Sequence, residues 1–174
     1  MLIQLDALKG LPVASIDDEA RIGVVSDALI HPDTGELVGF WVQPNGWLAP
    51  RRALSSSDVV SYDANAIVVR SAESLVNPAE IHAFKLLSAR RDRWIGKHVV
   101  TESGERLGRV QNVVINTDLE MLAKLYVTSF LPLGTERVIA RAEIVNVTQR
   151  LITVRGEGSA PAHTHTGVAE HAAA

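Results

Sequence analysis

Apolar and polar residues alternate in short runs along most of this chain, a pattern typical of β-strands. Between positions 22 and 30 both faces of the alternation carry apolar side chains, as expected for a strand inside a compact β-domain. The turn residues Pro-Asp-Thr-Gly follow at 32–35, and a second apolar run covers 37–43. We therefore predict that these two segments form a β-hairpin.

Three more short apolar runs lie at 51–54, 59–62 and 66–70. Five or six short strands, separated by turns at close intervals, predict a small antiparallel barrel with no room for a helix. In the returning strand of the hairpin, strand alternation predicts an inward-facing set of Val38, Phe40 and Val42.

The second half of the chain repeats the first. Arg21-Ile22-Gly23-Val24-Val25 returns as Arg106-Leu107-Gly108-Arg109-Val110, at an offset of 85 positions. At this offset, residues 11–70 align on 96–155 without an insertion or deletion, and the predicted inward set becomes Ala123, Leu125 and Val127. A unit that recurs once indicates a duplicated domain. The predicted fold class is all-β with one linker helix: two small six-stranded antiparallel barrels in tandem.

The segment between the repeats carries the signals of a helix. Asn77 suits an N-cap, Pro78 suits the first helical position, and apolar residues recur at Ile81, Phe84 and Leu87. We expect this helix to pack between the barrels, with arginines closing its end. The predicted organisation is a first barrel at 1–74, a linker helix at 75–95, a second barrel at 96–157 and a flexible tail at 158–174.

Composition narrows the function classes. The 174 residues include no cysteine, which excludes disulfides and thiolate sites. The net charge is −3, which gives no sign of the concentrated basic surface that nucleic-acid binding requires, so we do not expect nucleic-acid binding. No run approaches the ~18 apolar residues of a membrane span, and the N-terminus does not resemble a signal peptide. We expect a cytoplasmic protein without a transmembrane segment, for which peripheral association with a membrane stays open.

No pattern of reactive residues predicts catalysis. The histidines lack a metal-ligand spacing, and the acidic run at 17–19 lacks the alternating ligands and glycine of a calcium loop. The serines at 55–57 have no neighbouring histidine or nucleophile-elbow pattern. We therefore predict no catalytic residue, no metal site and no cofactor.

The hairpin sequences resemble a known family. Gly23-Val24-Val25-Ser26-Asp27-Ala28-Leu29-Ile30, followed by Asp33 and Gly35, is similar to the glycine-containing strand and turn of PRC-barrels. The second copy reads Gly108-Arg109-Val110-Gln111-Asn112-Val113-Val114-Ile115 with Asp118; Asn112 replaces the usual aspartate, and Glu120 stands where Gly35 does. This family is named after the H subunit of the bacterial photosynthetic reaction centre and also includes a domain of the bacterial ribosome maturation factor. The resemblance implies a six-stranded barrel that acts as a binding or regulatory module, with no shared catalytic residue.

Large aromatic and apolar residues provide the candidate partner-binding site. Strand alternation places Trp41 and Tyr126, which are equivalent in the two repeats, outside the barrel core. The equivalent loops carry Trp47 in the first repeat, and Phe130 with Leu131 in the second. Such groups indicate either an interface with a partner or a second copy, or burial between the barrels of one chain. Both readings stay open.

Three functions are consistent with these observations. The first is a noncatalytic interaction or scaffold protein whose protein partner is unknown and which could form a homodimer. The second, by analogy with the reaction-centre subunit, is a membrane-surface regulator of a photosynthetic or electron-transfer complex. The third is a small-ligand binder or enzyme that uses a groove between the barrels. The sequence favours the first.

Overall fold

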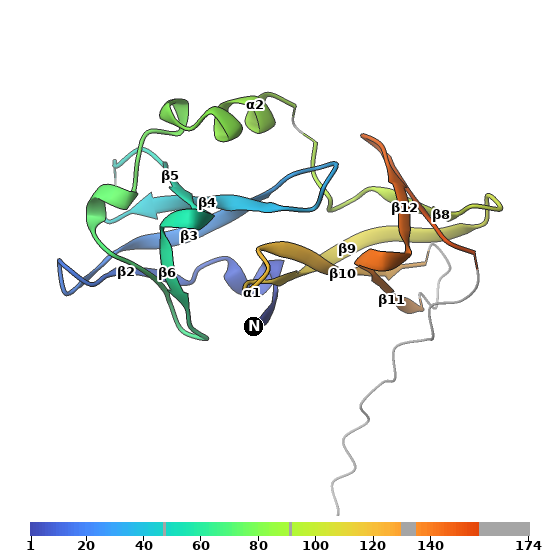
Figure 1. Cartoon of the computed structure of the whole chain (residues 1–174), viewed down its shortest axis with the longest axis horizontal. Helices are drawn as coiled ribbons and strands as arrows, with labels where there is room; N and C mark the ends of the chain where they lie inside the picture. Colours follow the sequence, from blue (N-terminus) through green and yellow to red (C-terminus); the bar gives the residue numbers. More distant parts are fainter. Residues whose placement is uncertain (47, 91, 130–134, 157–174) are drawn as a thin grey trace, which may run out of the picture.

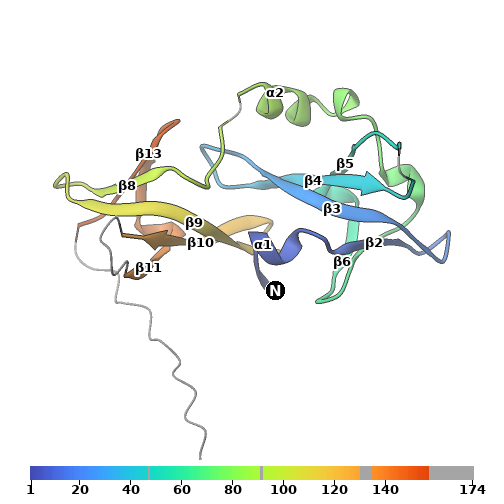
Figure 2. The ribbon, with the colours of Figure 1, turned by 180° about the vertical axis from the view of Figure 1, so that it is seen from behind.

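The protein consists of two β-sheet lobes that lie end to end along the long axis (Figures 1 and 2). This computed structural model describes residues 1–46, 48–90, 92–129 and 135–156. Repeat one forms one six-stranded sheet in the order β5-β4-β3-β2-β7-β6. Its strands are β2 (Pro12–Ser15), β3 (Ala20–Ile30), β4 (Leu37–Pro44), β5 (Arg52–Ser55), β6 (Val59–Tyr62) and β7 (Ile67–Val69).

Repeat two has the same strand order, β11-β10-β9-β8-β13-β12. Its strands are β8 (His98–Thr101), β9 (Arg106–Asn116), β10 (Met121–Thr128), β11 (Glu136–Ala140), β12 (Ile144–Val147) and β13 (Leu151–Val154). The predicted fold class of two six-stranded β-units is therefore confirmed. One neighbouring pair in each sheet, β2 with β7 and β8 with β13, is parallel, whereas we had predicted antiparallel pairing throughout.

Short helices connect these strands. Within the described ranges, two are α-helical, α1 (Leu5–Leu8) and α2 (His82–Arg90). Four are 3-10 turns: η1 (Ser56–Asp58), η2 (Ala72–Ser74), η3 (Pro78–Glu80) and η4 (Arg141–Glu143). Asn77 accepts a hydrogen bond from the Ala79 N–H at 3.1 Å, so the predicted cap exists, although it begins a 3-10 turn that precedes α2.

The alignment of the repeats differs from the prediction at one turn. Val13 pairs with Gly23 in β3, and Val99 pairs with Gly108 in β9, so β2 and β8 correspond at an offset of 86. Gly10 and Gly96, both at φ +86°, follow the same offset. From Arg21 onward the offset is 85, because the turn between β2 and β3 has one residue more than its counterpart. The ungapped alignment was therefore wrong for the first strand.

The inward-facing sets were partly correct. Phe40 and Val42 are buried as predicted, and so are their counterparts Leu125 and Val127. Leu37 and Leu122 are also buried, in place of the predicted Val38 and Ala123, which are half-buried. Register shifts between Leu29 and Ile30 and between Leu122 and Lys124 break the alternation, so a simple period of two fails at the start of each returning strand.

The two lobes dock through reciprocal contacts. The Leu37 N–H donates to the Glu120 carbonyl at 2.8 Å, and the Leu122 N–H donates to the Gly35 carbonyl at 2.7 Å. The 85-residue offset converts one of these bonds into the other, as expected for repeats related by a two-fold axis. Each repeat therefore supplies one donor and one acceptor to the junction.

The N-terminal segment also crosses the junction. β1 (Leu2–Gln4) pairs with β9 of repeat two, and α1 follows it toward β3. The Met1 amino group contacts the Asp118 carboxylate at 2.5 Å, which fixes the segment to the turn of the second hairpin. The range predicted as the first barrel, 1–74, thus gives its first strand to the second sheet.

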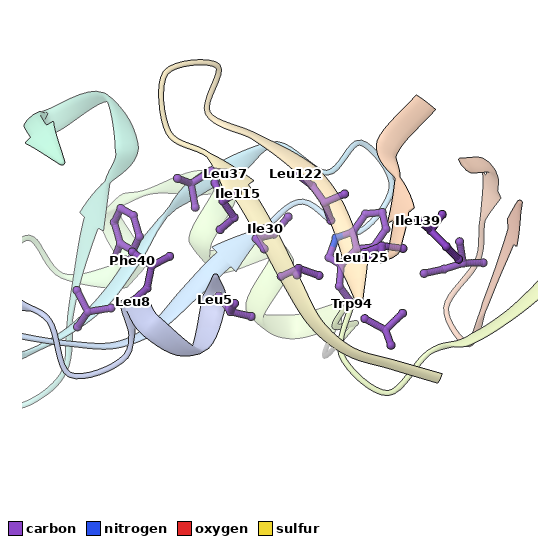
Figure 3. Packing of buried hydrophobic residues seen from close by; sticks show 14 of the residues in the cluster. Leu5, Leu8, Ile30, Leu37, Phe40, Trp94, Ile115, Leu122, Leu125 and Ile139 are labelled. Atoms are coloured by element: carbon purple, nitrogen blue, oxygen red, sulfur yellow. The ribbon is translucent and has the colours of Figure 1, made fainter. Parts of the chain in front are cut away.

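One hydrophobic core runs through both lobes (Figure 3). It contains Leu8, Ile30 and Phe40 from repeat one, Ile115, Leu125 and Ile139 from repeat two, and Trp94 from the linker. Because the two halves share this core, they cannot separate without exposing apolar surface to water. The continuous core therefore fixes the orientation of one barrel relative to the other.

The linker helix lies elsewhere than predicted. α2 covers the outer face of repeat one beside β4 and β5, rather than packing between the barrels (Figures 1 and 2). Phe84 and Leu87 are buried on its inner side, while Leu86 on the opposite side is 54% exposed. The apolar stripe was correctly identified, but its packing partner is the face of a single sheet.

Candidate interaction surfaces

Trp41 in β4 is covered by the helix α2. Its ring meets the Phe84 ring edge-on, with 5.2 Å between centroids, and the Arg51 guanidinium lies 5.0 Å from the Trp41 centroid. Gly39 lies two residues before Trp41 on the same strand, and a Cβ there would come within 3.1 Å of Phe84. The helix therefore buries much of this surface within the chain, and Trp41 stays half-buried.

Tyr126 occupies the equivalent position in β10 and is also half-buried. The place of Gly39 is taken by Lys124, which is exposed. Because a Cβ at Gly39 would already lie 3.1 Å from Phe84, we expect the longer side chain of Lys124 to prevent a helix from packing here in the same way. Within the described ranges, no ring stacks on Tyr126, and its role in partner binding stays a prediction.

The other predicted interface residues, Trp47, Phe130 and Leu131, lie outside the described residues. Of the predicted partner-binding residues, the structure describes Trp41 and Tyr126. The five-residue partner-binding site remains a prediction from the sequence.

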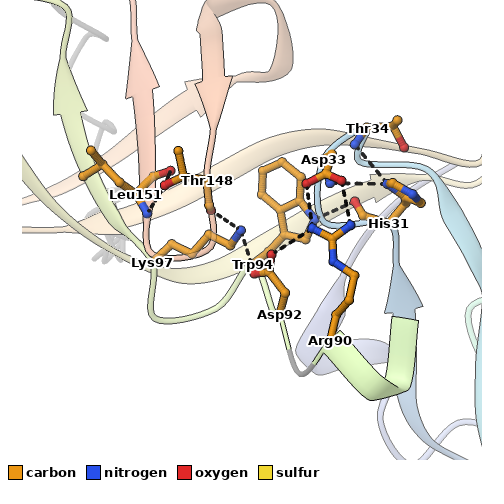
Figure 4. A network of polar contacts seen from close by, with 9 residues as sticks. All are labelled: His31, Asp33, Thr34, Arg90, Asp92, Trp94, Lys97, Thr148 and Leu151. Carbon is orange, nitrogen blue, oxygen red and sulfur yellow. Dashed lines mark hydrogen bonds and ion pairs between the residues drawn. The ribbon is translucent and has the colours of Figure 1, made fainter. Parts of the chain in front are cut away.

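Charged residues gather where the linker meets both lobes (Figure 4). Arg90 makes a two-pronged contact with Asp33, at 2.7 and 3.0 Å, and this guanidinium holds the pKa of Asp33 below its usual range. Arg90 also lies 3.4 Å from Asp92, whose other oxygen lies 2.8 Å from the Lys97 ammonium. Lys97 then donates a hydrogen bond to the Thr148 carbonyl at 2.7 Å.

The Asp92–Lys97 pair is buried, with both side chains 2% exposed. The Lys97 ammonium also lies 5.7 Å from the Trp94 ring centroid, and the Trp94 indole N–H donates to the His31 carbonyl at 3.1 Å. A chain of polar contacts thus runs from the first hairpin turn through the linker to the last turn of repeat two. This chain of contacts was not predicted from the sequence. Lys97 aligns with the apolar residue Leu11 only at the offset of 86 that holds for the first strand, and the predicted alignment used 85.

Tyr62 is the other unusual polar group. Its hydroxyl is buried without a hydrogen-bond partner among the described residues, and its ring lies 6.1 Å from Phe40. Burial raises the pKa of the Tyr62 phenol, and the nearby Glu120 carboxylate adds to the effect. Glu120 itself accepts a hydrogen bond from the Ser56 hydroxyl at 3.1 Å, which adds a side-chain contact between the repeats.

Other classes of site are not evident in the described part of the chain. It contains no group of three or more metal-ligating side chains. None of its helices is both long and apolar enough to span a bilayer. Two surface pockets lie at the barrels themselves, one beside β11 and β13 and one beside β6 and η2, and neither lies in the groove between the barrels.

Comparison with known proteins agrees with this architecture. The family model described as the PRC-barrel domain matches residues 2–76 and again 88–156. A search of curated proteins found no match. Both matched segments coincide with the two six-stranded sheets, so the sequence resemblance and the observed topology lead to one assignment. The chain belongs to the PRC-barrel family, a family of protein-interaction modules, and contains two copies of its domain.

Proposed function

We propose that this protein is a noncatalytic scaffold or regulatory protein that binds a protein partner through its two PRC-barrels. The observation that carries the proposal is that two interaction modules are held in one fixed orientation. The reciprocal backbone bonds at Leu37 and Leu122 and the shared core link the barrels. Two modules fixed in this way present their outer surfaces at a constant separation, which suits simultaneous binding of two sites on one partner.

The exposed part of the Tyr126 face is the best-supported partner surface among the predicted residues. The equivalent surface around Trp41 already has an occupant, α2, which satisfies its aromatic ring within the chain. Tyr126 carries no such ring contact among the described residues, and the neighbouring Lys124 adds a positive charge. Tyrosine is one of the residue types enriched in interface hot spots.

Affinity purification from the native host, followed by cross-linking and mass spectrometry, tests the proposal. We expect a specific partner that is retained by the parent protein and by Trp41→Phe, and that is weakened at least tenfold by Tyr126→Ala. A second copy of the chain is one such partner, and light scattering at tens of micromolar would detect it. A monomer that retains no protein above background would contradict the proposal. We also place this role in the cytoplasm, in keeping with the absence of cysteine, and fractionation would test that assignment.

A further inference from the structure

The two barrels differ at the end where the last strand leaves the sheet. In repeat one the chain continues across that end as residues 71–76, which we call the plug. The Ala72 N–H donates to the Asp18 carboxylate at 2.9 Å, beside the turn between β2 and β3. Four residues later, Val76 and Ala53 of β5 exchange two backbone hydrogen bonds of 3.0 Å. The plug therefore runs from the end of β7 to the free edge of β5.

The plug also contributes a side chain to the interior. Val76 lies beside Ala53, which packs on the outer side of β5 with Trp41, so the preceding residue Leu75 points the other way. Leu75 packs against the hydrophobic core of the barrel. Repeat one thus fills its open end with an apolar side chain on a strand-like segment of its own.

Repeat two lacks these residues in its sequence. At the same offset, Leu75 and Val76 correspond to Ala160 and Pro161. Alanine cannot supply a leucine-sized side chain, and proline has no N–H to donate in the manner of Val76. The chemistry that closes repeat one is therefore not encoded after repeat two.

The corresponding end of repeat two contains a pocket of about 360 Å³. Its apolar wall consists of Leu107 of β9, Ile139 of β11 and Val154 of β13. Two of these residues, Ile139 and Val154, are equivalent to Leu54 and Val69, which belong to the core of repeat one. The pocket therefore lies at the mouth of the second barrel, on the side that Leu75 occupies in the first.

The rim of the pocket can bind an anion. Arg137 and Arg155 both line it, and neither forms an ion pair with a carboxylate among the described residues. The rim also carries the carboxylates of Glu105 and Glu143, and Glu143 already accepts a hydrogen bond from the Ala140 N–H at 2.6 Å. The Thr101 and Ser103 hydroxyls lie 2.7 Å apart and form a polar edge beside the arginines.

We propose that the mouth of repeat two binds an extended segment of a partner protein that carries a leucine-sized residue close to an acidic residue. Leu75 of the plug shows the apolar half of this fit, and Glu73, two positions before it, suggests the spacing of the acidic residue, although Glu73 itself pairs with no arginine among the described residues. The apolar side chain enters beside Ile139 and Val154, and the acidic group pairs with Arg137 or Arg155. This inference rests on the proposed function and names the kind of segment that the partner contributes.

A peptide derived from the plug tests the inference in the full-length protein. The probe is residues 71–77, Ser-Ala-Glu-Ser-Leu-Val-Asn, blocked at both ends and labelled with a fluorophore. We expect saturable binding by fluorescence anisotropy, with a Kd on the order of 0.1 mM, as suits so short a ligand. Amide NMR shifts should map to Thr101, Ile139 and Val154, and not to the equivalent strands of repeat one.

Matched variants separate the site from general effects. Replacing the leucine of the peptide by serine, or its glutamate by lysine, should weaken binding at least tenfold. In the protein, Arg137→Glu should weaken binding by a similar factor, whereas Arg52→Glu at the equivalent position of repeat one should leave it unchanged. Thermal denaturation of both variants checks that they remain folded, and Arg155→Gln offers a milder change at the same rim.

Three outcomes would overturn the inference: no saturable binding to the parent protein, NMR shifts confined to repeat one, or binding that requires deletion of residues 157–174. The last result would identify the end of this chain as the occupant of the mouth. A partner recovered from the host whose cross-links avoid the mouth would leave the interaction role intact and reject only the assignment of this pocket. The absence of any partner would instead reject the proposed function itself.

Discussion

Repeat one and repeat two share a strand order but differ in how their surfaces are covered. The outer face of the first is covered by α2, and the plug packs Leu75 against its core, whereas the second has Lys124 at the position of Gly39 and a pocket walled by Leu107, Ile139 and Val154. A pocket in repeat one lies beside the plug and is lined by Arg70 and Glu73. We therefore expect the two copies to contribute unequally to the proposed partner binding, because more of the surface of repeat one is covered by residues of its own chain.

The packing of α2 on repeat one depends on the absence of a side chain at Gly39. Gly39 has φ +153°, and a Cβ there would lie 2.2 Å from the Leu54 carbonyl oxygen. We expect Gly39→Ala to destabilise the protein by at least about 4 kcal/mol, because β4 and β5 would have to separate. Lys124→Ala, at the equivalent exposed position, should change the free energy of unfolding by less than about 0.5 kcal/mol. Chemical denaturation measures both, and equal effects would refute the distinction between the two faces.

The aromatic anchor of α2 gives the next largest effect. Phe84 is fully buried on the face that carries Trp41, so Phe84→Ala should cost about 3–5 kcal/mol through lost burial and a cavity. Leu86→Ala on the exposed side of the same helix is the control and should cost less than about 1 kcal/mol. If hydrogen exchange in α2 is the same in the two variants, the helix is not held by Phe84.

Much of this architecture could be predicted from the sequence, because local alternation and a repeated motif are both visible in it. The hairpins, the duplication and the apolar stripe of α2 depend on neighbouring residues. The burial of Leu37 and Leu122 could not be predicted, because a bulge changes the side of the sheet that a residue faces. The placement of α2 was wrong for a related reason: the stripe identifies a buried face but not its partner.

The candidate site was harder to predict. Three of the five residues chosen for partner binding lie outside the described residues, and Trp41 is satisfied by Phe84 within the chain. The plug was not predicted, because Leu75 and Val76 directly precede the expected helix cap Asn77 and were assigned to the linker. Only the backbone pairing of Val76 with Ala53, which joins residues far apart in the sequence, reveals its role. The pocket follows from comparing the repeats once that role is known.

The buried ion pair in the linker offers a third way to test the asymmetry. Lys97 corresponds to Leu11, since both carbonyls accept the N–H of equivalent core valines. Lys97→Leu should cost about 3 kcal/mol, because it leaves the buried Asp92 carboxylate without its ammonium partner. The double variant Asp92→Asn with Lys97→Leu should recover part of this loss, because it removes the unpaired buried charge. A double variant no more stable than the single one would show that the pair stabilises the junction beyond charge compensation.

The smallest expected effect concerns the exposed contact between Arg90 and Asp33, which ties the end of α2 to the first hairpin turn. The guanidinium lowers the pKa of Asp33 in the folded state, so its contribution to stability is present above the ordinary pKa near 4 and is lost as the pH falls through the lower folded value. Both side chains are more than 40% exposed, so solvent screening limits the contribution to about 1 kcal/mol or less. Asp33→Asn should therefore reduce the free energy of unfolding by about 0.5–1 kcal/mol at pH 7, and the difference should diminish as the pH falls below the ordinary pKa of an aspartate, about 4. Asp17→Asn is the control, because the Asp17 side chain makes no hydrogen bond or ion pair with any described residue. This change should leave the free energy of unfolding the same at neutral and at acidic pH. A loss at Asp33 that persists at low pH would mean that the turn depends on the shape of the side chain rather than on its charge.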